Sequence, residues 1–195
     1  MNRIKFINDN KEYFILISFG KNKIEFNTLN NISFSSAYLK CFESDSNLHS
    51  LLEFSGDRGI SVIITDLQER VIFFASFIKN DIEKVIELYN VCKDFQLCEL
   101  SPYLILKTII KYFVKDNPIF NNYNKIRLAI LKKTKYLEPA LLLYTRLGFT
   151  VEQKNTQVVV NLPPYFSMIR DLETKDKNKV NFDHEYSKVI PIIRE

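Results

Sequence analysis

Apolar residues along the chain fall into short extended runs that are rich in Ile, Val and Phe. Runs of this length and composition are typical of β-strands. The pattern predicts strands over residues 12–19, 24–29, 60–65, 71–78, 85–91, 125–131, 149–152 and 165–172. Turn-forming residues at 20–23 and 66–69 separate neighbouring runs, so we expect a hairpin at each of these places.

One segment after these strands has the signals of a helix. Ser101 suits the N-cap, because its side-chain oxygen can accept an orphan backbone N–H, and Pro102 suits the first helical position, where no N–H is needed. Asn117 and Pro118 are expected to end the helix. The apolar positions that should face the core follow a helical spacing: Leu104, Ile105, Thr108, Ile109, Tyr112 and Phe113.

A second helix is predicted over residues 139–147, with Gly148 at the position after the helix that favours a left-handed backbone. Shorter helices are expected over residues 36–42 and 48–54. The order strands, hairpin, strand, helix, strand, helix, strands indicates a single α/β domain. Its strand–helix–strand unit predicts parallel pairing of the segments 85–91 and 125–131.

Two stretches resemble the GNAT superfamily of acyltransferases. The stretch from Val91 to Ser101 resembles the loop of that family in which a strand ends and a Gln/Arg-x-x-Gly-x-Gly/Ala turn opens a helix around acyl-CoA. The stretch from Ala140 to Phe149 resembles the signature A-x-x-L-Y-x-x-x-G-F. The resemblance covers roughly residues 60–172 and implies a mixed, mainly antiparallel α/β (α+β) sheet, flanked by helices, with two central parallel strands splayed around a cofactor cleft.

The resemblance also implies a site and a reaction. The reaction would move an acetyl group from acetyl-CoA, as co-substrate, to a primary amine. Tyr144 matches the residue that protonates the departing thiolate, and Glu87, with Glu83 as second choice, could take the proton of the amine. Each could instead be an ordinary core or strand residue. Acetyl-CoA would contact the strand and the loop after it: Leu88, Tyr89, Val91, Gln96, Leu97, Cys98, Glu99, Leu100 and Ser101.

The loop departs from the family pattern in a way that leaves a second hypothesis open. Glu99 replaces the first loop glycine and Ser101 the second. Glycines permit a close approach of the backbone to a ligand, although backbone N–H groups at a helix N-terminus can hold a pyrophosphate without any particular side chain. The alternative to an enzyme is therefore a catalytically decayed GNAT-like domain that serves as a binding or assembly module.

The composition limits which binding partners and which cellular compartment are expected. The 195-residue chain is 46% hydrophobic and carries a formal charge of +4, an excess too small to indicate nucleic acid. Cys41, Cys92 and Cys98 form no CxxC pair, and His49 and His184 lie far apart, so no metal site is expected. The sequence shows neither a secretion signal nor a long uncharged apolar stretch, which predicts a cytoplasmic protein with reduced thiols and no membrane partner.

The domain is expected to end at residue 172. Residues 173–179 are charged and poor in apolar side chains, as in a linker, and the last residues contain the apolar cluster 189–193. We therefore expect residues 1–172 to form the GNAT-like domain. Residues 173–195 should form a tail that packs on its surface or on a second subunit of a homodimer.

Overall fold

The computed structural model describes residues 2–8, 11–19, 58–94, 96, 99–131, 136–154, 157–158 and 165–177. The chain forms two compact units, Met1–Tyr123 and Asn124–Glu195. The strand expected over residues 24–29, the helices expected over 36–42 and 48–54, and the cluster 189–193 lie outside the described residues.

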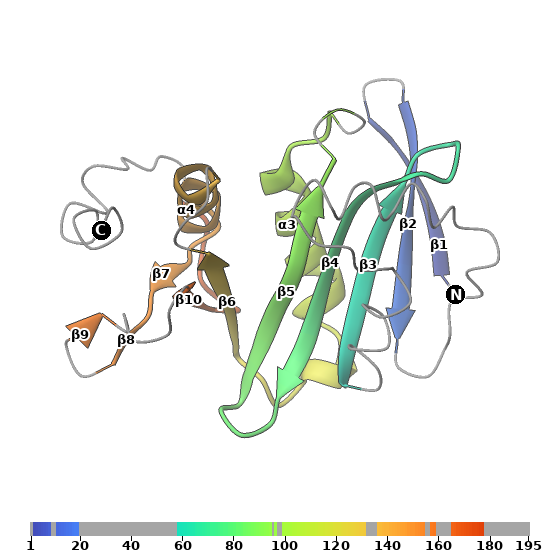
Figure 1. The fold of residues 1–195 in the computed structure, drawn as a ribbon. Helices are drawn as coiled ribbons and strands as arrows, with labels where there is room; N and C mark the ends of the chain where they lie inside the picture. The colour runs from blue at the N-terminus through green and yellow to red at the C-terminus, as the bar shows by residue number, and fades with distance from the viewer. Residues whose placement is uncertain are drawn as a thin grey trace. The chain divides into compact units, whose positions relative to one another are not determined.

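The first unit is built on a sheet in which each strand is antiparallel to the next along the chain. The strands lie side by side in sequence order (Figure 1): β1 (Asn2–Asn8), β2 (Lys11–Phe19), β3 (Gly59–Thr65), β4 (Val71–Asn80) and β5 (Val85–Lys93). Sequence reasoning identified β2 to β5 and missed β1. Asp9 and Asn10, which lie between β1 and β2 in the sequence, are both turn-forming residues, and this pair could have indicated the β1–β2 hairpin.

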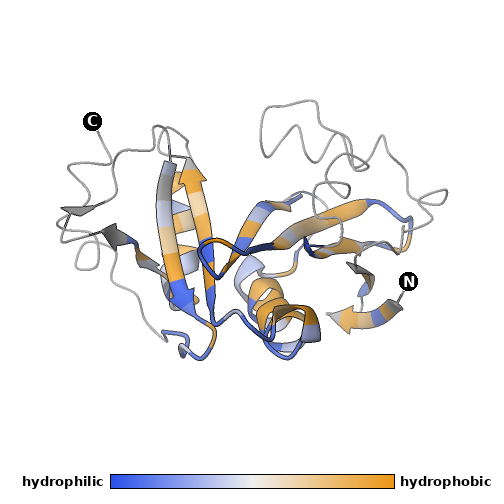
Figure 2. Ribbon diagram, turned by 90° about the horizontal axis from the view of Figure 1, so that it is seen from below, coloured by the Kyte–Doolittle hydropathy of each residue, from blue (hydrophilic) through white to orange (hydrophobic). Residues whose placement is uncertain are grey.

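The central strands β3 and β4 are buried on both faces, which explains why their sequences are almost continuously apolar rather than alternating. Phe73 and Phe77 are among the largest fully buried side chains, and each contributes about 1.5–3 kcal/mol by leaving water. Gly59 begins β3 because a Cβ at this position would clash with the carbonyl oxygen of Phe77 on β4. Figure 2 shows the hydrophobic colouring of these strands and of the helix α3 against one face of the sheet.

Helix α3 (Pro102–Ile109) continues into a π-helical turn, η3 (Ile110–Val114), and a 3₁₀ turn, η4 (Pro118–Phe120), follows. As predicted, Asn117 marks the end, and its side chain accepts a hydrogen bond from the N–H of Ile119 at 3.1 Å. The predicted apolar stripe was partly wrong, because Leu104, Thr108 and Tyr112 are exposed. The buried face instead consists of Ile105, Leu106, Ile109, Ile110 and Val114.

In the second unit, β6 (Lys125–Leu131) pairs antiparallel with β10 (Tyr165–Asp171), which also pairs with β7 (Thr150–Val151). Helix α4 (Leu137–Arg146) precedes β7, and the short strands β8 (Gln153–Lys154) and β9 (Gln157–Val158) form a separate hairpin. The predicted bounds of β6 are those observed, and the helix predicted over 139–147 begins two residues earlier, at Leu137.

A buried arginine joins the end of α4 to the residues that follow β10. Arg170, only 7% exposed, donates hydrogen bonds to the carbonyl oxygens of Leu147 and Thr174, and its guanidinium lies 3.6 Å from the carboxylate of Asp176. Burial lowers the pKa of Arg170, and the charge of Asp176 opposes this shift.

The chain after β10 is thereby held against α4 rather than extended away from it. The backbone N–H of Lys177 donates to the carbonyl of Arg146 at 2.9 Å. Gly148 has φ +84°, and a Cβ there would lie 2.8 Å from a methyl group of Thr174. Residues 173–177, the first five of the stretch expected as a linker and tail, are described and contact the end of α4, and the division of the chain at residue 172 stays a prediction.

Candidate functional site

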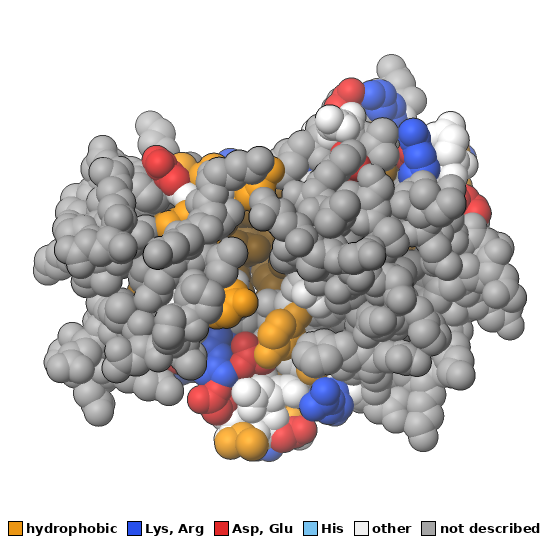
Figure 3. Space-filling model, viewed as in Figure 1, with side chains coloured by type: hydrophobic (Ala, Val, Ile, Leu, Met, Phe, Trp, Pro, Cys, Tyr) orange, Lys and Arg blue, Asp and Glu red, His pale blue; other side chains and the backbone are white. Residues whose placement is uncertain are grey.

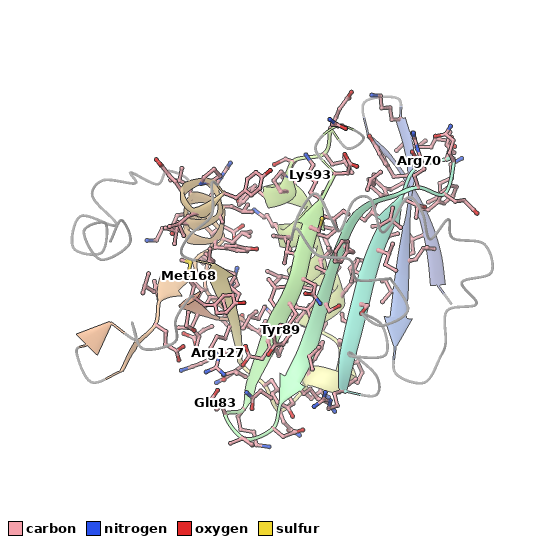
Figure 4. The ribbon with its side chains drawn as sticks, in the orientation of Figure 1. Arg70, Glu83, Tyr89, Lys93, Arg127 and Met168 are labelled. Carbon is pink, nitrogen blue, oxygen red and sulfur yellow. The ribbon has the colours of Figure 1, made fainter. Side chains whose placement is uncertain are left out.

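Strand β5 carries most of the residues expected to bind or act on substrates. Glu87 is 9% exposed and Leu88 is buried, whereas Tyr89 is 39% exposed and Val91 is half-buried. Glu87 and Tyr89 share one face of the strand by its period of two, and Leu88 points to the other. Figure 4 shows Tyr89 along β5 and Glu83 at the turn that precedes this strand.

The pairing of β4 with β5 is interrupted at the predicted contact residues. Ser76 lies opposite Tyr89, but Phe74 lies opposite Cys92, so β5 contains one extra residue between these pairs. Asn90, within this irregularity, has φ 53°, a left-handed conformation that Asn tolerates better than most residues. Bulges of this kind redirect the neighbouring side chains and backbone groups. Sequence reasoning missed Asn90, although an Asn inside a strand of apolar residues was a usable signal.

The two carboxylates proposed as bases meet at a single side chain. Asn80, the last residue of β4, directs its Nδ2 towards Glu87 Oε1 at 3.2 Å and towards Glu83 Oε2 at 3.4 Å. Its Oδ1 accepts a hydrogen bond from the backbone N–H of Glu83 at 3.1 Å. Glu83 is exposed and Glu87 is buried, so only Glu87 is removed from bulk water. Asn80 was not identified from the sequence.

Two carboxylates lie in the described part of the loop after β5, and each of them has a partner. Asp94 is buried, and its side chain accepts a hydrogen bond from the N–H of Gln96, which is itself exposed. Glu99 forms an ion pair with Lys11 of β2, with 2.5 Å between Nζ and Oε1. The negative charge of Glu99 is therefore paired with a lysine. Leu100 is buried, whereas Leu97 and Cys98 lie outside the described residues.

The N-terminus of α3 fits an anionic group. Ser101 is the N-cap residue, as predicted, with extended backbone angles, but its side chain makes no capping hydrogen bond. The first turn of the helix contains no acidic residue. The N-terminal N–H groups of a helix attract anions such as phosphate. A pyrophosphate could therefore bind at the N-terminus of α3, and the charge of Lys11 lies next to the loop that precedes this helix.

Tyr144 lies on α4 among apolar residues and packs edge-on against Phe149, with 5.7 Å between ring centroids. Burial strongly raises the pKa of its hydroxyl, which keeps the proton on the oxygen at neutral pH. No hydrogen bond joins this hydroxyl to a described residue. Because no buried side-chain oxygen in the described part of the chain lacks a partner, the hydroxyl oxygen itself reaches the surface although most of the side chain is buried.

The prediction of free thiols was wrong at one position. Cys92, at the end of β5, is buried as expected but is disulfide-bonded, and its partner lies outside the described residues. Cys41, Cys98, His49 and His184 also lie outside them. In the described ranges, no three His, Cys, Asp or Glu side chains are placed to hold a metal ion.

Comparison with known proteins gives a consistent answer for the fold. No family model and no curated protein sequence matches the chain. Solved structures do match: the ribosomal-protein-S18-alanine N-acetyltransferase of Escherichia coli superposes with a TM-score of 0.55 at 13% identity, over 86% of this chain and 99% of that one. The chain has the GNAT fold.

Two further structures show the same likeness. A GNAT-family acetyltransferase from Staphylococcus aureus Mu50 has a TM-score of 0.54 at 15% identity, over 82% of this chain and 99% of its own. A spermidine N-acetyltransferase chimera from Vibrio cholerae and hSSAT has a TM-score of 0.53 at 16% identity, over 81% of this chain and 95% of its own. The predicted resemblance and fold class are confirmed. No helix in the described ranges is long and apolar enough to cross a membrane.

Proposed function

We propose that this protein is an acyl-CoA-dependent N-acetyltransferase that transfers an acetyl group from acetyl-CoA to a primary amine. The GNAT fold makes this reaction the first hypothesis, because the similar solved structures are named as acetyltransferases. The observation that carries the proposal is Tyr144, which lies on α4 and whose accessible hydroxyl makes no hydrogen bond with the described residues.

Tyr144 would act as the general acid. A thiolate is a costly leaving group in a dry site, so a phenol that keeps its proton can lower the barrier by transferring this proton to the departing sulfur. Burial raises the pKa of Tyr144, so its hydroxyl is protonated over the whole physiological pH range.

Glu87 would act as the general base, with Glu83 as the second candidate. An alkylammonium must lose a proton before its nitrogen can attack a carbonyl carbon, and a carboxylate is a suitable acceptor of that proton. Glu87 is the better candidate because it is buried, whereas Glu83 is exposed. An acceptor nitrogen held at Glu87 would exchange its proton with that carboxylate and not with bulk water.

Bound acetyl-CoA would supply the acetyl group as a thioester. The N-terminal amides of α3 and the loop that includes Gln96 and Leu100 would bind its pyrophosphate, and the backbone of β5 near Leu88, Tyr89 and Val91 would face its pantetheine. Because Glu99 is paired with Lys11, the missing loop glycine does not place an uncompensated negative charge at the phosphates.

A second function, a decayed GNAT-like domain used for binding or assembly, is favoured by one observation. Glu99 and Ser101 stand where the family has glycines that let the backbone approach the ligand. In this hypothesis the fold is retained and turnover is lost.

Thermal unfolding of the full chain in acetyl-CoA tests both functions. Binding to the folded state alone raises stability by about 2.7 kcal/mol at 100 times the dissociation constant. We expect a higher melting temperature with acetyl-CoA than with acetate alone, together with transfer to simple primary amines. A higher melting temperature with no transfer to any amine would favour the binding module. An unchanged melting temperature at millimolar acetyl-CoA, with no transfer, contradicts the enzyme.

A further inference from the structure

The turn between β4 and β5 contacts residues beyond its own backbone. Asp81 accepts a hydrogen bond from the hydroxyl of Tyr123, a buried residue at the end of the first unit. The ammonium of Lys84 lies 5.8 Å from the centre of the Tyr123 ring, and Lys84 itself has φ 55°. In Figure 3, acidic, basic and polar side chains gather at the lower edge of the view, where this turn lies.

Asn80 stands at the base of this turn and makes two kinds of contact. Its Oδ1 accepts from the N–H of Glu83 within the turn, which is a structural role. Its Nδ2 donates to the carboxylate of Glu87, seven residues further along, at 3.2 Å. The turn requires only the first contact, since an oxygen acceptor at residue 80 is sufficient to cap it.

We propose that Asn80 is a positioning residue that orients the carboxylate of Glu87 for proton transfer from the acceptor amine. The inference rests on the proposed function of Glu87 as base. Asn80 is neutral, so it can donate to the carboxylate without forming an ion pair that would compete with a cationic amine. The turn that holds Asn80 is itself fixed by Asp81 and Tyr123, so the donor is in place before the acceptor arrives.

Two substitutions separate the positioning role from the structural one. Asn80→Asp keeps an oxygen that can accept from the N–H of Glu83 but removes the donor to Glu87, whereas Asn80→Ala removes both. If Asn80 positions Glu87, the two variants lose kcat to a similar extent, by about tenfold to a hundredfold, with little change in KM for the amine. Only Asn80→Ala would then show a clearly lower melting temperature.

If Asn80 has only a structural role, the opposite result is expected for Asn80→Asp. That variant would keep the turn and transfer acetyl groups from acetyl-CoA to primary amines at the normal rate. Because the new carboxylate lies near Glu83, the comparison is repeated in a Glu83→Gln background, which removes one of the neighbouring negative charges. Full activity of Asn80→Asp in both backgrounds would overturn the inference.

A double-mutant cycle with Glu87→Gln distinguishes failure of this inference from failure of the proposed function. If Asn80 acts through Glu87, adding Asn80→Asp to Glu87→Gln causes no further loss of rate. A slow Glu87→Gln with a fully active Asn80→Asp refutes the positioning role alone. A fully active Glu87→Gln refutes the base itself, and the inference falls with it.

Discussion

Two tyrosines with the same exposure, 8%, differ in what their hydroxyl groups contact. The hydroxyl of Tyr123 donates to Asp81, while the hydroxyl of Tyr144 has no hydrogen-bond partner within the described residues. A buried hydroxyl normally finds a partner, because its desolvation is otherwise uncompensated. Tyr123 therefore has the environment of a structural residue, whereas the hydroxyl of Tyr144 is accessible and, in the proposed function, would donate to a bound ligand.

Arg170 extends the comparison to a charged group. It is as buried as the two tyrosines, but the carbonyl oxygens of Leu147 and Thr174 and the carboxylate of Asp176 surround its guanidinium. Polar groups that the chain itself satisfies should matter for stability, and a group that it leaves unsatisfied should matter for activity. Substitutions at these positions test this rule.

Arg170→Met should cause the largest loss of stability. It leaves the carbonyl oxygens of Leu147 and Thr174 and the carboxylate of Asp176 without their common donor, and removal of one partner from a buried ionic contact costs about 3–5 kcal/mol. Urea unfolding of the purified full chain would measure the loss. The matched control is Arg146→Met, at an exposed position of α4, which should change stability much less. Equal losses in the two variants would contradict the structural role of Arg170.

A pair of truncations should give a smaller but clear difference. Ending the chain after Leu172 removes Thr174 and Asp176, so that the charge of Arg170 loses its carboxylate. Ending it after Lys177 preserves these contacts and the hydrogen bond from Lys177 to Arg146. We expect the longer variant to be the more stable of the two by circular dichroism melting. If both melt at the same temperature, residues 173–177 do behave as a linker.

The sequence was most informative where local signals are strong. Gly148 predicted the end of α4, because backbone geometry limits the choice of residue at that position, and the apolar run over residues 125–131 predicted the bounds of β6. The sequence was least informative where tertiary packing decides which side chains are buried. The exposed positions of Leu104 and Tyr112 depend on which face of α3 meets the sheet, and the helical period alone does not fix that face.

The residues of the candidate site also divide into those that the sequence predicts and those whose contacts depend on tertiary packing. Tyr144 was proposed from the resemblance, and Glu87 and Glu83 from their shared face of an extended segment. The contacts of Asn80 and the pairing of Glu99 with Lys11 instead join residues whose proximity depends on strand register. No local pattern encodes the distance between Lys11 and Glu99, which are 88 positions apart. The contact of Lys177 with Arg146 was not predicted for the same reason, since these residues are far apart in the sequence.

Tyr123→Phe should have a moderate effect that depends on pH. The hydrogen bond to Asp81 raises the pKa of Tyr123 to about 12, above the value near 10 of an unfolded tyrosine. Its stabilisation is therefore complete below pH 10 and is lost as the pH rises towards 12. We expect Tyr123→Phe to melt at a lower temperature than wild type at pH 7, with the difference shrinking between pH 10 and 12.

The control for this pH dependence is Tyr112→Phe, at an exposed position on η3. It should leave both the melting temperature and its alkaline dependence unchanged. A constant difference between Tyr123→Phe and wild type from pH 7 to pH 12 would show that the bond to Asp81 is not the cause.

Tyr144→Phe removes the hydroxyl proposed as the general acid and keeps the ring that packs against Phe149. Melting temperature and single-turnover acetyl transfer from acetyl-CoA are measured on the same preparation. Since no described residue loses a hydrogen bond, the account predicts an unchanged melting temperature and a rate lower by about a hundredfold or more. A variant that transfers acetyl groups as fast as wild type would contradict the assignment of Tyr144 as the acid.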